Sequence, residues 1–456
     1  MKMRNFRRLS IDQLKEWHKF TPRKPLILNG ARQVGKTSLM KSFAKELPCR
    51  THYINFEIED AVHACFLGSL SPREIIAKLA LSRGVPIDSS ADLLIFDEIQ
   101  SCPRALHSLK YFAEDLPDQA VIAAGSLLGI SLSNESYPVG KVREIQISPM
   151  NFFEFLCALD REDLGDKLLA LEYEDNFPLV LHETLFELWK KYLIVGGLPE
   201  VVGVYIDNAS DLFKAVEEVR YAQLELVGNY TRDMAKHAGK TNSLHLERII
   251  KNIPAQLARV VDDSVKRFRF GGVVPGISQY STLASAFDWL ERANLVHRIQ
   301  EVHKGEEPLG QFVKESFFKL YMFDVGILGA IGGVPAKLLL DFTTGFYKGY
   351  IAENYVIQAL KGAGLKNVYG WREGESEVEF VWQSEQGIVP IEVKSGQVTR
   401  AKSLTNFCAR YAPRKAVIFG ATRPRVDGAV HRLPIYVAGL WDISKLTSSG
   451  QKRLTH

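Results

Sequence analysis

The sequence predicts an α/β fold that begins with a parallel sheet flanked by helices. Short, nearly continuous apolar runs recur along residues 1–150, as expected of strands that are buried on both faces of a sheet. Helix-like patterns lie between these runs, and such alternation is typical of a parallel α/β layer. The chain is then expected to continue as a helical lid, a winged-helix module and a smaller α/β domain.

Five apolar stretches are the predicted strands of the first layer. They are PLILNG at 25–30, HYINFE at 52–57, LLIFDE at 93–98, AVIAAGS at 120–126 and VREIQIS at 142–148. The helical patterns between them include KTSLMKSFAKEL at 36–47 and PREIIAKLALSRG at 72–84. Together these elements place the first domain at residues 1–150.

The remainder of the chain divides into three further parts. Residues 151–245 are helical in pattern, which predicts the lid. Two helical patterns and a closing apolar strand follow, the order found in winged-helix modules, and they place that module at 246–340. A last α/β pattern covers 341–456.

Composition excludes several classes of protein. Hydrophobic residues make up 46% and charged residues 24%, as in ordinary globular proteins. No apolar run reaches the roughly 18 residues of a membrane span, and MKMRNFRRLS lacks the apolar core of a secretory signal. The five cysteines are scattered and never in C-x-x-C spacing, which argues against a zinc site. We therefore expect a cytoplasmic protein without a membrane partner.

Charge is unevenly spread along the chain. The formal net charge is +4, but Lys and Arg far outnumber Asp and Glu in residues 393–456, so a basic end follows an acidic body. A basic end can face nucleic acid, or it can be an ordinary solvated surface.

A phosphate-binding loop, GARQVGKTS, is predicted at 30–38. It fits G-x-x-x-x-G-K-[ST] and lies between a predicted strand and a predicted helix. Its backbone N–H groups and the helix N-terminus would surround the phosphates of ATP. Lys36 would reach the β- and γ-phosphates, and Thr37 would ligate Mg²⁺. The expected nucleotide-binding residues are Gly30, Ala31, Arg32, Gln33, Val34, Gly35, Lys36, Thr37 and Ser38.

An acidic pair, Asp97 and Glu98, follows the predicted strand at 93–98. Ligands bind at the carboxyl ends of such strands, so Asp97 is expected to hold Mg²⁺ through water. Glu98 is expected to polarise the attacking water. The alternative is that the pair caps a helix N-terminus.

Two further residues are weaker catalytic candidates. Ser126 ends the next strand and is placed to sense the γ-phosphate, although Gly-Ser after a strand is often only a turn. Arg232, in NYTRDM, would stabilise charge within its own chain or in a neighbouring one. A surface salt bridge on a helix is the alternative for Arg232.

A hairpin near the end carries a third group of candidates. GESEVEFVW at 374–382 and VPIEVKSG at 389–396 are separated by a short polar turn. Alternation puts Glu379 and Glu392 side by side, with Lys394 next to them. The same alternation predicts an opposite, apolar face made of Val378, Phe380 and Trp382.

The neighbouring carboxylates predict a metal site or a salt-bridged hairpin. Two such carboxylates repel each other unless a cation lies between them, and a second Mg²⁺ or an Mn²⁺ would serve. Glu353, on the apolar face of the helical pattern at 349–360, is a third candidate ligand. Glu392 and Lys394 would then be catalytic. Alternatively, Lys394 only neutralises Glu379 and Glu392, and the hairpin supports stability or DNA binding.

VKRFRFGG, at 265–272, alternates basic and aromatic residues. It is either a nucleic-acid-facing strand or an edge strand with Phe268 and Phe270 turned inward.

The chain resembles a family of prokaryotic AAA-superfamily ATP-binding proteins, and the matching segments follow in order along its whole length. In that family an ATPase module precedes a C-terminal domain of unknown function with a restriction-endonuclease-like core. The matching segments include PLILNGARQVGKTSL, IFDEIQ, AAGSLLG, YLIVGGLPEVV, FDWLERANLVHRI, GYIAENYV and IEVKSG. The resemblance implies ATP with Mg²⁺, a winged-helix connector and a nuclease-like end. The strand acid of the nuclease motif is usually Asp, and Glu379 stands in its place.

The predicted function is therefore that of a Mg²⁺-dependent ATPase coupled to a nuclease-like domain that binds or cuts DNA. Self-association through the ATPase module is a further expectation. The alternative is an ATP-dependent switch that acts on a protein partner and carries a catalytically inactive nuclease fold.

Overall fold

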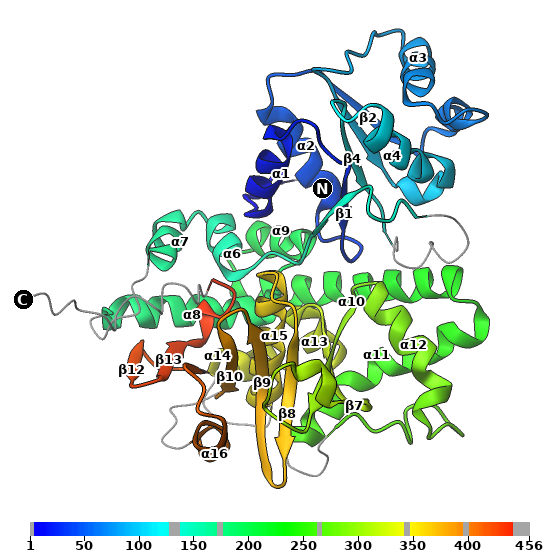
Figure 1. Ribbon diagram of the computed structural model, residues 1–456. Coiled ribbons are helices and arrows are strands. Elements are labelled where there is room, and N and C mark those ends of the chain that lie inside the picture. The colour runs from blue at the N-terminus through cyan, green and yellow to red at the C-terminus, as the bar shows by residue number, and fades with distance from the viewer. Residues whose placement is uncertain are drawn as a thin grey trace, which may run out of the picture. The chain divides into compact units, whose positions relative to one another are not determined.

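A computed structural model describes residues 4–126, 137–170, 177–261, 267–341, 347–394 and 401–440. The chain forms two compact units (Figure 1). The first unit is Met1–Ser148 with Arg292–Asn294, and the second is Pro149–Glu291 with Leu295–His456.

The first unit is built on a parallel sheet. Its strands are β1 Leu26–Asn29, β2 Thr51–Asn55, β3 Leu93–Asp97, β4 Ala120–Ala124 and β5 Arg143–Gln146. They pair in the order β2-β3-β4-β1-β5, and every pairing is parallel. These are the five apolar runs of the sequence, so the predicted parallel layer is confirmed.

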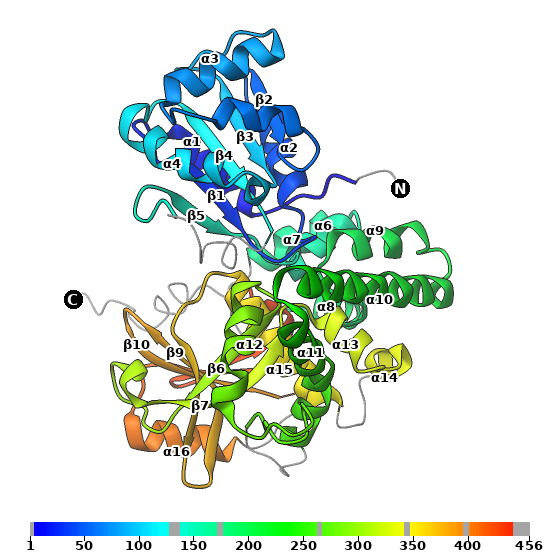
Figure 2. The same cartoon turned by 90° about the vertical axis from the view of Figure 1, so that its right-hand side faces the viewer.

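Helices lie on both faces of this sheet (Figure 2). They are α1 Ser10–Lys19, α2 Lys36–Glu46, α3 Pro72–Arg83 and α4 Pro103–Asp115, with the short 3₁₀ helices η1 Asp60–Phe66 and η2 Ile99–Ser101. Side chains of α3, α4 and η1 form one core cluster with alternate strand residues such as Leu94, Phe96 and Val121. Helix α2 contacts β3 and β4, and α1 packs against α2.

The strand order brings three chain segments to one edge of the sheet. Strand β4 pairs with β1 on one side and with β3 on the other. Because all three strands are parallel, their carboxyl ends lie at the same edge. The loop after β1, the end of β3 at Asp97 and the residue Ser126 after β4 therefore meet there.

The second unit begins with helices. They are α6 Phe152–Ala158, α7 Glu162–Leu169, α8 Leu179–Val195, α9 Pro199–Asp207, α10 Leu212–His237, α11 Lys240–Val261 and α12 Tyr280–Arg292. Helix α6 starts at a capping box, in which the Asn151 side chain accepts from Glu154 N and the Glu154 side chain accepts from Asn151 N. The Asp211 carboxylate caps α10 in a similar way. Across the described ranges, every helix is too short or too polar to span a lipid bilayer.

A buried aspartate explains two glycine-containing motifs of the sequence. Asp324 caps α13 Val325–Ile331 by accepting from Ile327 N at 3.0 Å, and it also accepts from Gly197 N at 2.7 Å. At Gly196, φ is 76° and a Cβ would lie 2.2 Å from Asp324 Oδ1. Only glycine fits this position. The contact of Asp324 with Gly196 and Gly197 therefore accounts for the glycines of YLIVGG and the aspartate of FDVGIL as structural residues.

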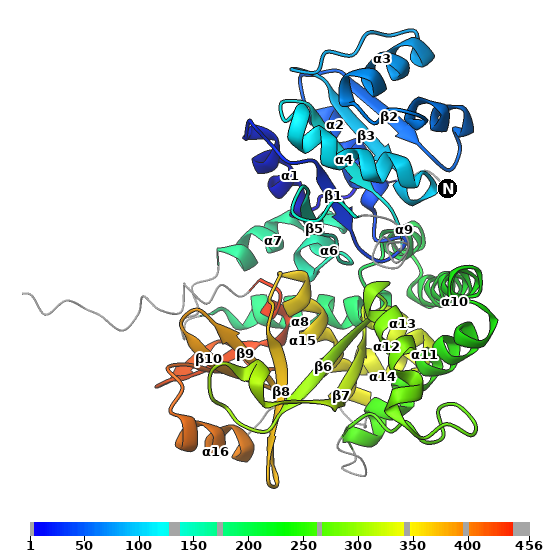
Figure 3. The ribbon, with the colours of Figure 1, turned by 45° about the vertical axis from the view of Figure 1, so that its right-hand side comes forward.

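A mixed sheet forms the centre of the second unit (Figure 3). Its strands are β6 Val296–Val302, β7 Val313–Met322, β8 Val368–Glu373, β9 Ser376–Ser384, β10 Gly387–Val393, β11 Ala416–Gly420, β12 Arg425–Asp427 and β13 Val430–Pro434, in the order β12-β13-β11-β10-β9-β8-β6-β7. The remaining helices are α14 Ala336–Asp341, α15 Tyr347–Gly362 and α16 Lys402–Tyr411, with the 3₁₀ helices η3 Leu309–Phe312 and η4 Ile435–Val437. Strand β6 pairs with β8, so one sheet joins segments 246–340 and 341–456.

A β-bulge in β9 changes which side chains share a face. Strands β9 and β10 form the expected antiparallel hairpin. Between β8 and β9, however, Tyr369 pairs with Val381 and Trp371 pairs with Val378, so β9 carries one extra residue. Val378 and Val381 therefore share the cluster that packs under α16, while Phe380 lies against Tyr321. The predicted apolar face of Val378, Phe380 and Trp382 is wrong for Phe380, because strict alternation fails at the bulge.

The basic and aromatic segment packs its phenylalanines inward. Phe268 is 3% exposed, and Phe268 and Phe270 contact Phe287 and Phe318. Residues 267–272 are irregular backbone rather than a strand, and Val265 and Lys266 lie outside the described residues. The inward packing agrees with the expectation that Phe268 and Phe270 turn inward, although the segment is not an edge strand.

Candidate functional site

The phosphate loop is held by its glycines and by Lys36. At Gly30 a Cβ would lie 2.2 Å from the carbonyl oxygen of Ile147, and Gly35 has φ of 95°, so neither position accepts another residue without strain. Lys36 begins α2 and is 8% exposed. Its Nζ donates to the carbonyl oxygens of Gly30 at 2.9 Å and Ala31 at 2.8 Å. Two carbonyl groups of the loop thus bind the Lys36 ammonium, which is the group expected to contact phosphate.

A buried arginine near the N-terminus braces this loop. Arg8 is 8% exposed, and its guanidinium donates to Val34 O at 2.8 Å and to Ser148 O at 2.7 Å. It therefore ties the loop to the segment after β5. The sequence does not single out Arg8, because one arginine in the basic segment MKMRNFRRLS carries no signal that distinguishes it from its neighbours.

Burial changes the charge balance of Lys36. Desolvation lowers the pKa of Lys36 to about 8, and the charges of Glu98 and Asp97 offset only part of this effect. A bound triphosphate would favour the charged ammonium in the same place. The site is therefore short of negative charge at the position where phosphate is expected.

Asp97 is oriented through both of its oxygens. It is 2% exposed at the end of β3, its Oδ2 accepts from Tyr53 OH at 2.6 Å, and its Oδ1 accepts from Glu98 N at 3.1 Å. Burial and this bond to Asp97 raise the pKa of Tyr53. A carboxylate beside the loop that carries the Thr37 hydroxyl is an all-oxygen donor set of the kind Mg²⁺ prefers. Tyr53 was missed as a site residue, although it lies in the YINFE segment.

Glu98 does not serve as a helix cap. It has φ of 51° at the position before η2, and its side chain makes no capping hydrogen bond. Instead, Glu98 Oε2 accepts from Gln100 Nε2 at 2.6 Å. The same nitrogen donates to Ser126 Oγ at 3.4 Å. Gln100 was also missed, although it ends IFDEIQ, because a sequence cannot show that the chain reverses at Glu98.

Arg232 lies on α10 in the second unit. Its side chain is exposed, and its guanidinium donates to Asn229 Oδ1 one turn earlier. Its role as a charge-stabilising arginine stays a prediction.

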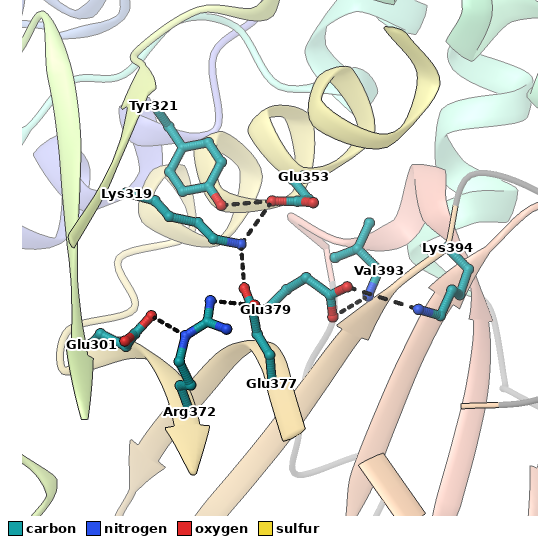
Figure 4. A network of polar contacts seen from close by, with 9 residues as sticks. All are labelled: Glu301, Lys319, Tyr321, Glu353, Arg372, Glu377, Glu379, Val393 and Lys394. Atoms are coloured by element: carbon teal, nitrogen blue, oxygen red, sulfur yellow. Dashed lines mark hydrogen bonds and ion pairs between the residues drawn. The ribbon is translucent and has the colours of Figure 1, made fainter. Parts of the chain in front are cut away.

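A second polar cluster lies on the sheet of the other unit (Figure 4). Lys319 of β7 is 8% exposed, and its Nζ lies 2.7 Å from Glu377 Oε1 and 3.6 Å from Glu353 Oε2. Tyr321 OH donates to Glu353 Oε2 at 2.7 Å. The helix acid Glu353 is therefore bound to a lysine and a tyrosine of β7, which the sequence prediction did not include.

Glu377 is held by a second cation. Arg372 of β8 donates to a Glu377 oxygen, and its Nε lies 3.0 Å from Glu301 Oε2. The nearby cations, Lys319 first, hold the pKa of Glu377 below its usual range in spite of burial. This half of the cluster is an internal ion-pair network.

The other half contains the predicted pair of glutamates. Glu392 is 3% exposed, and its Oε1 lies 2.5 Å from Lys394 Nζ. Glu379 Oε1 lies 3.8 Å from the same ammonium, and its Oε2 accepts from Val393 N at 3.3 Å. The structure thus brings together Glu379, Glu392 and Lys394. Within the described residues, Glu392 Oε2 is buried without a hydrogen-bond partner.

A shared proton would satisfy this pair. Burial and the adjacent Glu392 charge raise the pKa of Glu379 to about 8. A proton on Glu379 can be donated to Glu392, which then keeps its charge beside Lys394. Across the described ranges, His, Cys, Asp and Glu side chains nowhere gather in threes in a way that suits a metal ion. A metal ion held by Glu353, Glu379 and Glu392 therefore stays a prediction.

We expect stability to depend on pH through Glu379. A carboxyl whose folded-state pKa is raised stabilises the fold at low pH and loses that contribution as pH rises toward about 8. Glu379→Gln mimics the protonated acid, so its urea midpoint should match that of the wild type near pH 5 and exceed it near pH 9. The midpoints would be measured by tryptophan fluorescence across this range.

Glu385→Gln, at the exposed turn of the same hairpin, is the matched control and should follow the wild-type curve. Parallel curves for the wild type and Glu379→Gln would show that Glu379 is ionised throughout.

Three family models match the chain. Residues 22–156 match a family described as AAA domain. Residues 186–338 match one domain of unknown function (DUF8612), and residues 348–436 match another (DUF4143). A search of curated proteins found no match.

Solved structures show weaker likenesses. The Walker-type ATPase paby2304 of Pyrococcus abyssi is 16% identical with a TM-score of 0.44, covering 72% of this chain and 95% of that one. Cdc6p from Pyrobaculum aerophilum is 16% identical with a TM-score of 0.27, covering 75% and 97%. The replication initiator DnaA, bound to AMPPCP and single-stranded DNA, is 15% identical with a TM-score of 0.30, covering 64% and 90%. These TM-scores lie below 0.5, so the likenesses establish no shared activity.

The matched model at 22–156 spans the phosphate loop, Asp97, Glu98 and Ser126. Residues 22–156 therefore form an AAA domain, which is followed by two domains of unknown function.

Proposed function

We propose that the first unit hydrolyses ATP with Mg²⁺. The observation that carries this proposal is the meeting of a buried ammonium, Lys36, with the oriented acids Asp97 and Glu98 at one edge of a parallel sheet. A cation, a metal-binding carboxylate and a base are the three groups that phosphoryl transfer to water requires.

Each residue has a separate role in this reaction. The loop N–H groups and Lys36 bind the phosphates, and Lys36 exchanges its two carbonyl partners for phosphate oxygens. The Thr37 hydroxyl and the Asp97 carboxylate would hold Mg²⁺, which neutralises charge on the phosphates. The Glu98 carboxylate accepts a proton from the attacking water, and Ser126 donates a hydrogen bond to the γ-phosphate.

Glu98→Gln tests this assignment. The amide cannot accept the proton of water as a carboxylate does, so ATP turnover should fall about a hundredfold or more. ATP affinity should stay close to that of the wild type, because the loop N–H groups and Lys36, and not Glu98, bind the phosphates in this assignment. Phosphate release and calorimetric ATP binding would be measured on the same preparations.

Glu57→Gln changes an exposed acid after β2 and serves as the control, with wild-type turnover expected. Full turnover in Glu98→Gln would assign the water to another residue.

For the second unit we propose an effector that responds to the nucleotide state without cutting DNA. Lys319 supports this proposal, because its ammonium lies 3.6 Å from Glu353, one of the three acids that a metal site would use, and so supplies an internal cation there. The specific observation that favours the rival, metal-dependent cleavage, is the buried Glu392 Oε2 without a partner among the described residues. DNA and a protein remain the two proposed partners, and self-association is proposed through the ATPase module.

Metal titration separates the two accounts of the second unit. We expect no saturable Mn²⁺ binding that depends on Glu392 at millimolar concentration, and no scission of plasmid DNA. Calorimetry would compare the Lys36→Ala variant with the Lys36→Ala/Glu392→Gln double variant. Lys36→Ala is present in both proteins to reduce metal–nucleotide binding at the first site. Binding that disappears in Glu392→Gln, together with strand scission that stops in Lys394→Ala, would establish the nuclease instead.

A further inference from the structure

We propose that Gln100 is a positioning residue that fixes the Glu98 carboxylate and the Ser126 hydroxyl in one arrangement for ATP hydrolysis. The proposal rests on the ATPase function proposed above. Its basis is a single nitrogen with two acceptors, since Gln100 Nε2 donates to Glu98 Oε2 at 2.6 Å and to Ser126 Oγ at 3.4 Å. One side chain thus links the proposed base, Glu98, at the end of β3 to the polar residue Ser126 after β4.

The backbone explains how Gln100 reaches both partners. Glu98 has φ of 51°, in the left-handed region that residues with a Cβ rarely adopt. This reversal starts η2 and turns the side chain of residue 100 back toward residue 98. Ser126 comes within reach because β4 is the parallel neighbour of β3. Strain of this kind persists where the surrounding structure fixes it, and it is common at active sites.

The chemistry of the three groups settles which way the amide points. An ionised carboxylate only accepts hydrogen bonds, so the amide nitrogen of Gln100 must face Glu98 rather than its oxygen. The Ser126 oxygen also accepts from that nitrogen. Ser126 therefore does not use its own O–H in this contact, and among the described residues that O–H can still donate, as a contact to a γ-phosphate oxygen requires.

The same contact leaves part of Glu98 available for catalysis. Within the described residues, Gln100 engages Oε2, and no hydrogen bond to Oε1 is found. Oε1 can thus accept the proton of the attacking water while Oε2 is held in place. Misplacement of a reacting group by about 1 Å can cost roughly a hundredfold in rate. Gln100 therefore affects the rate of hydrolysis rather than the binding of ATP.

Gln100→Met is the direct test, because methionine keeps the length of the side chain and removes the donor. We expect kcat for ATP to fall about tenfold or more, with KM and calorimetric ATP affinity unchanged. Gln119→Met is the matched control. Gln119 is also an amide next to β4, although more buried than the half-buried Gln100, but it precedes the strand and donates to Asp92 O at 2.7 Å, at the opposite edge of the sheet. Its kcat should equal that of the wild type.

A second measurement distinguishes positioning from a general loss of structure. If Gln100 acts through Glu98, then Gln100→Met should cause little further loss of kcat in a Glu98→Gln background. An equal loss in both backgrounds would overturn the proposal, as would a wild-type kcat in Gln100→Met. Wild-type protein without any ATP turnover would refute the proposed function itself, whereas an active wild type with an unaffected Gln100→Met would refute only this role.

Discussion

The burial of charge without a matching counter-charge is the constraint on which the first site depends. The Lys36 ammonium is almost completely buried, and the groups that it bonds to are two neutral carbonyls of its own loop. Burying a cation is costly, and the lowered pKa of Lys36 expresses that cost. The loop glycines and the Arg8 brace keep the backbone in a shape that still allows this arrangement. An anion that replaces the carbonyls would relieve the constraint, which is why the geometry favours a phosphate ligand.

The second unit meets the same constraint in the opposite way. Its acids are paired with cations from other strands of the sheet, as Lys319 of β7 and Arg372 of β8 pair with the half-buried Glu377 of β9. Where a cation is not enough, at Glu379 and Glu392, burial favours a proton. Such a network is expensive to assemble and strongly disturbed when one member is removed. Ion pairs and a shared proton can therefore stabilise this cluster without a bound metal ion.

Local patterns predicted the elements and the phosphate site, whereas distant contacts could not be predicted. Buried parallel strands are continuous apolar runs, and the loop at 30–38 has a spacing fixed by phosphate geometry, so both are visible in the sequence. The pair of glutamates followed from strand alternation and hairpin pairing. The bulge at Phe380 depends on how β8 pairs with β9, and Lys319 comes from a strand that is far away in sequence. The contacts of Gln100 depend on a backbone reversal at Glu98 that no residue type announces.

Proton uptake on ATP binding is the measurement that tests the central claim most directly. Lys36 has its pKa lowered to about 8 in the protein without nucleotide, and the bound triphosphate should restore the charged form. The account predicts that ATP affinity falls as pH rises from 8 to 9.5, by up to about tenfold per pH unit, with proton uptake seen by calorimetry in buffers of different ionisation enthalpy. Lys36→Arg, which stays charged, should show little pH dependence in this range. ATP binding that is equally tight at both pH values without proton uptake would contradict the account, as would the absence of ATP binding.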